Sequence, residues 1–107
     1  MKRNVLLVGK RGFVVADLQD RLSMANIQLF GASSIEEVRA TMAQTKVDHV
    51  IMGAGLDLEV RLEAVREIFH SSDTTTVHMK DFASGPEGFF PFIQSVLKGL
   101  EGAEQEC

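Results

Sequence analysis

Glycine and cationic residues follow three of the short apolar runs in the chain. They are Gly9, Lys10, Arg11, Gly12, Gly53, Gly55 and Lys80. Such runs predict buried parallel strands, whose carboxyl ends flank the ligand crevice of an open α/β domain. Lysine and arginine attract anions, and glycine allows a ligand to approach the backbone closely. We therefore predict a site for an anion such as a phosphate group. The alternative is that the cations are solvated loop charges and the glycines serve tight turns.

The elements that would position these residues alternate along the chain. Apolar runs predict strands at residues 5–8, 27–30, 49–52 and 75–79. Apolar residues recur at helical spacing over residues 13–25, 35–42, 58–69 and 89–100. Strict alternation of strands and helices predicts an α/β domain in which helices cover both faces of a parallel sheet.

Local signals predict how the helices begin, end and pack. Asn26 is expected to end the first helix, because asparagine tolerates the left-handed conformation there. Ser34 and Glu37 have the spacing of a capping box at the start of the second helix. Pro91 should either start the last helix or bend it. The third helix has an apolar stripe that is expected to face the core, made of Leu58, Leu62, Val65 and Phe69.

Length, charge and cysteine content limit the function classes. The 107 residues suit one domain, which we place at residues 1–102, with a flexible tail at 103–107. A net charge of −4 argues against nucleic-acid binding. No apolar run approaches the roughly 20 residues that span a membrane, and the N-terminal run is too short for a signal peptide. The single cysteine, Cys107, allows no internal disulfide, which favours a cytoplasmic protein.

The first half of the chain resembles a response-regulator receiver domain. The run VLLV at residues 5–8 matches the first receiver strand, and residues 32–52 resemble the second helix and third strand. This resemblance implies a three-layer, flavodoxin-like sheet of four strands in the order 2-1-3-4. A Rossmann-type order, 3-2-1-4, is the alternative. The second half resembles receivers more loosely, because one of their five βα units is missing. Lys80 would match their phosphate-contacting lysine.

The residues that receivers use for phosphorylation are absent. Receivers hold Mg²⁺ with two carboxylates after the first strand and phosphorylate an aspartate that ends the third strand. Gly9, Lys10 and Gly53 occupy the matching positions. Mg²⁺ needs oxygen ligands and phosphoryl transfer needs a nucleophile, so we predict no enzyme activity and no cofactor. The resemblance then implies a pseudo-receiver, a regulatory or protein-interaction module. The alternative is a module that binds a phosphate-bearing metabolite or (di)nucleotide at the basic edge.

A second resemblance, to the dinucleotide fingerprint of extended short-chain dehydrogenases, is weaker. It rests on Gly9 and Gly12 followed by Phe13. Val15 stands where the third glycine of the fingerprint would lie. No acidic residue follows the second strand to hold a ribose, and the chain has no tyrosine to serve as the catalytic residue.

The last third of the chain contains a cluster of phenylalanines: Phe82, Phe89, Phe90 and Phe92. They cannot all face one sheet from a single helix, so we predict that some form an association surface. Loss of a βα unit would leave the fourth strand as an open edge. Both features predict a protein partner or a homodimer formed through this strand and the last helix. His49 and His78 are expected to pack in the fold, because no neighbouring residues give a metal-ligand spacing.

Overall fold

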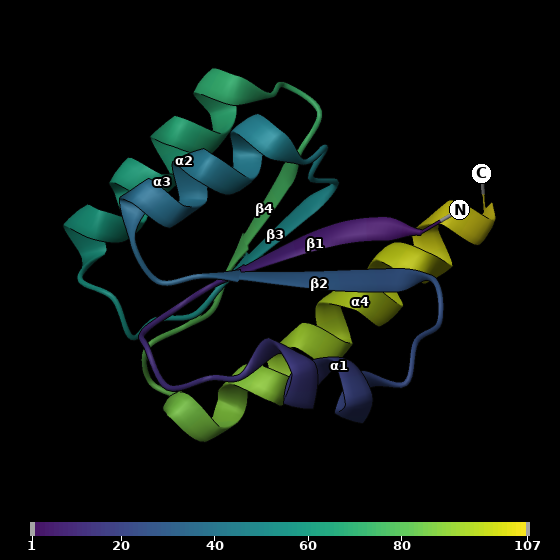
Figure 1. The fold of residues 1–107 in the computed structure, drawn as a ribbon. Helices are drawn as coiled ribbons and strands as arrows, with labels where there is room; N and C mark the ends of the chain where they lie inside the picture. Colours follow the sequence, from purple (N-terminus) through teal and green to yellow (C-terminus); the bar gives the residue numbers. More distant parts are fainter. Residues whose placement is uncertain (1, 107) are drawn as a thin grey trace.

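The computed structural model describes residues 2–106, and side chains over residues 2–100. Strands and helices alternate along the chain (Figure 1): β1 (Arg3–Val8), α1 (Val15–Leu22), β2 (Ile27–Ala32), α2 (Ile35–Gln44), β3 (His49–Met52), α3 (Leu58–Ser71), β4 (Thr76–Met79), the 3-10 turn η1 (Pro86–Gly88) and α4 (Phe89–Glu106). No helix among the described residues is long and apolar enough to cross a membrane.

The sheet is parallel throughout, with the strand order β2-β1-β3-β4. Figure 1 shows α1 and α4 on one face and α2 and α3 on the other. The three-layer α/β fold and the order 2-1-3-4 are therefore confirmed, and the Rossmann-type alternative is wrong. The inner strands β1 and β3 supply the most buried residues, whereas β4, at one edge, is partly exposed along its length.

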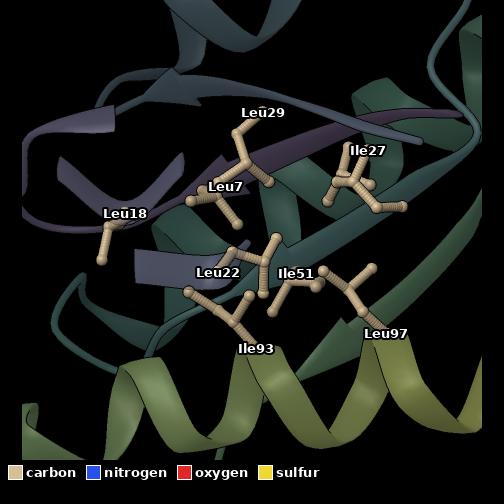
Figure 2. Packing of buried hydrophobic residues seen from close by; sticks show 9 residues of the cluster. Leu7, Leu18, Leu22, Ile27, Leu29, Ile51, Ile93 and Leu97 are labelled. Atoms are coloured by element: carbon tan, nitrogen blue, oxygen red, sulfur yellow. The ribbon is translucent and has the colours of Figure 1, made fainter. Parts of the chain in front are cut away.

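Each face of the sheet has its own apolar core. Val5, Leu7 and Ile51 face α1 and α4, where they pack with Ile93 and Leu97. Figure 2 shows Leu7 and Ile51 of the sheet meeting Ile93 and Leu97 of α4. The alternate residues of the same strands pack with α2 and α3; the buried members of this second core are Leu6, Val8, Ala32, Val38, Val47, Val50, Met52, Ala64 and Ile68. The two inner strands are thus enclosed on both sides, as unbroken apolar runs predict.

The end of α1 and one half of the α2 capping box differ from the predictions. α1 ends at Leu22, because Ser23 adopts the left-handed conformation with φ 53°, so Asn26 does not end it. The Ser34 hydroxyl caps α2 by accepting from the Glu37 N–H at 3.2 Å, as predicted. The Glu37 carboxylate accepts from the N–H of Ser33, at 2.7 Å, rather than from the N–H of Ser34.

The last helix begins before Pro91 and continues beyond residue 102. α4 starts at Phe89, so Pro91 lies in its first turn. N–H groups there have no acceptor within the helix, and proline's missing N–H leaves no gap in the hydrogen-bond pattern. The helix extends to Glu106, into the tail that we predicted at residues 103–107. The flexibility of that tail stays a prediction, and Cys107 lies outside the described residues.

The predicted apolar stripe of α3 does not face the core. Ala64 and Ile68 are fully buried, whereas Leu58, Leu62 and Phe69 are 55%, 50% and 50% exposed. The fourth member, Val65, is partly buried against the core. The helix has apolar residues on more than one side, and packing against the sheet selected the side with the small Ala64. The other side remains open on the surface.

A row of polar side chains crosses the sheet on the α1 and α4 face. Arg3 Nη1 lies 3.3 Å from His49 Nε2, and His49 Nδ1 lies 2.7 Å from Thr76 Oγ1. Thr76 Oγ1 lies 2.9 Å from His78 Nε2. A guanidinium can only donate, so His49 Nε2 accepts and the Nδ1 proton goes to Thr76. The threonine hydroxyl can then donate to a neutral His78. The row therefore packs both histidines into the fold by hydrogen bonds.

This row makes the stability of the fold depend on pH. Burial lowers the pKa of the His78 imidazole below its ordinary value of 6.5. The unfolded chain therefore binds a proton more tightly, so the stability contributed by neutral His78 is present above pH 6.5 and is lost as the pH falls through the lower folded pKa. We expect the free energy of unfolding, measured with urea at about pH 7.5 and about pH 5.5, to fall more for the wild type than for His78→Gln. If the free energy of unfolding falls equally in His78→Gln and in the wild type, His78 does not cause this pH dependence.

Candidate functional site

A cleft opens at the carboxyl ends of β1, β3 and β4, where the loop before α4 folds over the sheet edge. Its volume is about 770 Å³, within the range of small-molecule sites. The lining residues are Gly9, Lys10, Arg11, Gly12, Phe13, Gly53, Ala54, Gly55, Lys80, Phe82, Ala83, Gly85, Pro86 and Phe89. The structure therefore brings together every residue predicted for the anion site. It adds two of the phenylalanines predicted for an interface, Phe82 and Phe89.

The glycines that end β1 and β3 make room for an aromatic floor. A Cβ atom at Gly53 would lie 3.4 Å from the Phe89 ring. At Gly9 it would lie 3.4 Å from the Phe13 ring and 3.9 Å from the Phe89 ring. These two rings meet edge to face, with centroids 6.0 Å apart. A side chain larger than a methyl group at either glycine would displace this aromatic pair.

Two further glycines position the basic loop after β1. Gly12 has φ +122°, a conformation that residues with a side chain rarely adopt. A Cβ atom at Gly55 would lie 3.0 Å from Lys10 Cβ, so the lysine stem passes close to this backbone. Lys10 and Arg11 are exposed, and both line the cleft. The turn therefore places two exposed cationic side chains at the cleft.

Lys80 is a cation of a different kind, because it is buried. It is 4% exposed, and its Nζ donates to Ser84 Oγ at 2.5 Å and to the Asp81 carbonyl at 2.9 Å. An ammonium has three N–H donors, so one is left without a partner among the described residues. No carboxylate in the described part of the chain forms an ion pair with Lys80. A buried ammonium is costly to remove from water, and the nearby Asp81 carboxylate balances its charge only from beyond ion-pair distance.

The loop that contains Ser84 is held by Asp81. The Asp81 carboxylate accepts from the Ser84 hydroxyl at 2.8 Å and from the Ser84 N–H at 2.9 Å. These two hydrogen bonds lower the pKa of the Asp81 carboxyl, and the charge of Lys80 lowers it further. Asp81 is not among the residues that line the cleft. The charged lining is therefore cationic, while the nearby carboxylate is occupied in fixing the loop.

The predicted phenylalanine cluster divides between the cleft and the core. Phe82 is 79% exposed at the cleft, whereas Phe89, Phe90 and Phe92 pack against the α1 and α4 core. The Arg21 guanidinium lies 4.0 Å above the centre of the Phe90 ring. An association surface formed by these phenylalanines stays a prediction, and among the four only Phe82 is largely open to solvent.

The cleft lining is poor in groups that carry out acid–base or nucleophilic chemistry. It contains no carboxylate, histidine or cysteine that could act as a general base or nucleophile. In the described part of the chain, no group of three or more His, Cys, Asp or Glu residues could hold a metal ion. Sequence reasoning missed the roles of Ser84 and Asp81. The Asp-x-x-Ser spacing beside Lys80 was the available signal, since aspartate often accepts from nearby backbone in turns.

Comparisons with known proteins do not assign a family. No protein-family model matches the chain, and no curated protein or solved structure gives a significant match. Because a fold of this class supports many functions, the residues of the cleft itself must carry the functional inference.

Ser84→Ala tests the support of the buried lysine. The change removes one of two acceptors of the Lys80 ammonium and one donor to Asp81, so we expect it to lower the free energy of unfolding by about 1–2 kcal/mol. Urea denaturation measures the loss. Ser95→Ala changes an exposed serine of α4 and should stay within about 0.5 kcal/mol of the wild type. Equal stability of the two variants would mean that water replaces the Ser84 hydroxyl without cost.

Proposed function

We propose that the protein is a non-catalytic, receiver-like regulatory module that binds a phosphate-bearing small molecule in the cleft. One observation carries the proposal: Lys10, Arg11 and the buried Lys80 line a cleft of about 770 Å³ whose lining contains no carboxylate. A cytoplasmic location, expected from the single cysteine, would give the module access to phosphorylated metabolites.

The charges favour an anion over a neutral ligand. Lys80 is buried, and two of its three N–H groups donate to protein acceptors. The third N–H can donate to a ligand. A phosphate oxygen is a strong acceptor for lysine and would offset the cost of the buried charge. Lys10 and Arg11 sit on an exposed loop and can close on the same anion from the rim.

The size and the apolar lining favour a ligand larger than inorganic phosphate. Clefts of roughly 300–1,000 Å³ ordinarily enclose most of a drug-sized molecule. Away from the cations, the lining is made of aromatic and small apolar side chains, namely Phe13, Phe82, Phe89, Ala54, Ala83 and Pro86. A flat apolar group such as a nucleotide base can stack on exposed aromatic rings. A phosphate joined to such a group would use both parts of the cleft.

The resemblance to receivers fits a non-catalytic role. The positions that match the acidic pair and the phosphoryl acceptor are Gly9, Lys10 and Gly53, and the Phe89 ring packs against the two glycines. An aromatic ring therefore lies where a receiver would need carboxylates around Mg²⁺. The site would respond to a bound ligand rather than to its own phosphorylation.

Thermal-shift measurements on the purified protein test the proposal. The probes are inorganic phosphate, nucleoside mono- and diphosphates, NAD(H), NADP(H) and sugar phosphates, with adenosine as the probe without phosphate. A probe at a hundred times its dissociation constant should stabilise the fold by about 2.7 kcal/mol, which raises Tm by several degrees in a domain of this size. We expect a shift with at least one phosphorylated probe and none with adenosine.

Two lysine variants locate the binding site. Lys10→Ala should abolish or weaken the shift, because it removes a cation from the cleft rim. Lys98→Ala, which changes an exposed lysine on α4, should leave the shift intact. The proposal fails if no phosphorylated probe stabilises the protein at millimolar concentration, or if Lys10→Ala responds like the wild type.

A further inference from the structure

An apolar surface lies at the open side of the sheet, away from the cleft lining. We call it the α3–β4 face and define it by Leu58, Leu62, Phe69 and Met79, all large apolar residues with exposed side chains. The three α3 residues lie on one side of the helix, because their spacings of four and seven residues are close to whole numbers of turns. Contiguous apolar residues on a surface mark sites of association.

The edge strand extends this surface. β4 pairs with β3 on one side, and no strand pairs with its other side among the described residues. Such an edge presents unpaired N–H and C=O groups to any strand that can align with it. Arg61 Nη1 of α3 lies 3.5 Å from the Met79 sulfur of β4. The helix stripe and the strand edge therefore adjoin and form one surface.

Charges beside the apolar stripe show what kind of partner fits. Glu59, Glu63, Arg66 and His70 are exposed, and each directly follows a residue of the predicted stripe. The acidic pair occupies the first half of this flank and the basic pair the second half. Glu67, by contrast, is turned towards α2, where it forms an ion pair with Arg39 at 2.6 Å. The charges of this flank are therefore complementary to those of the same flank on a second α3 helix that runs in the opposite direction.

We propose that the occupant of the α3–β4 face is a second copy of this chain, related by a two-fold axis that runs the two α3 helices antiparallel. A two-fold axis brings the same surface of both copies together. Antiparallel helices place the acidic half of one flank beside the basic half of the other, for example Glu59 near Arg66 of the second copy. Parallel helices would place like charges together. The two open β4 edges can then pair antiparallel across the same axis.

This interface differs from the homodimer expected from the sequence. The homodimer predicted from the sequence uses the fourth strand and the phenylalanines of the last helix. In the structure, Phe89, Phe90 and Phe92 pack against the core of their own chain. Only the β4 edge is common to both proposals. The α3–β4 face does not use the cleft residues, so the dimer and ligand binding can stand or fail independently.

Sedimentation equilibrium of the full chain over a wide concentration range tests the proposal. We expect a monomer–dimer equilibrium in the wild type and a dissociation constant raised about tenfold or more in Leu62→Glu, because the change puts a charge at the centre of the interface. Leu62 is half exposed, so the variant should fold, and its thermal melt checks this. Phe82→Glu, at an exposed aromatic of the cleft, should dimerise like the wild type. A wild type that stays monomeric at about millimolar concentration, or a Leu62→Glu variant that dimerises normally, overturns the proposal.

Charge reversal tests the antiparallel arrangement. At low ionic strength, Glu59→Arg and Arg66→Glu should each weaken the dimer about two- to tenfold, and the double variant should regain wild-type affinity. A nonspecific apolar association would show no such recovery. A double variant as weak as the single variants would therefore rule out the proposed orientation. A dimer insensitive to all three changes would rule it out as well.

Discussion

Burial of β1 and β3 on both faces is the constraint on which the rest of the structure depends. Successive residues of a strand point to opposite sides, so Leu7 enters one core and Leu6 the other. Both cores must then be covered by helices, and each helix returns the chain so that the next strand runs parallel. The loops after the strands therefore emerge at one edge. The cleft forms between these loops at the carboxyl edge of the sheet.

Two features that oppose each other meet at the cleft: an aromatic pair that closes the core, and a buried charged group. The glycines that end β1 and β3 let Phe13 and Phe89 approach the sheet, which closes the core at that edge. The same edge buries the ammonium of Lys80, a group that is costly to remove from water. Ser84 and the Asp81 carbonyl satisfy part of its hydrogen-bonding capacity without neutralising its charge. Lys80 thus links the stability of the loop to the anion binding that we propose for the cleft.

β4 joins the two regions for which we propose functions, the cleft and the α3–β4 face. Its carboxyl end leads directly to Lys80 and the cleft, while its outer edge adjoins the apolar residues of α3. A longer α/β domain would cover this edge with a further strand and helix. In this chain the next helix, α4, returns to the opposite face and packs against Leu7 and Ile51. The side of α3 that carries Leu62 is left exposed as a consequence.

The sequence by itself determined the strands, the alternation with helices and the glycines and cations that line the cleft. Unbroken apolar runs identify strands, and parallel strands bring glycines and cations that are distant in sequence to one edge. Only the tertiary structure decided which side of α3 is buried, that α1 ends at Ser23, and that Ser84 supports Lys80. Periodicity shows which residues share a face of a helix. Which face is buried depends on the shape and chemistry of the neighbouring elements, and these exist only once the chain has folded.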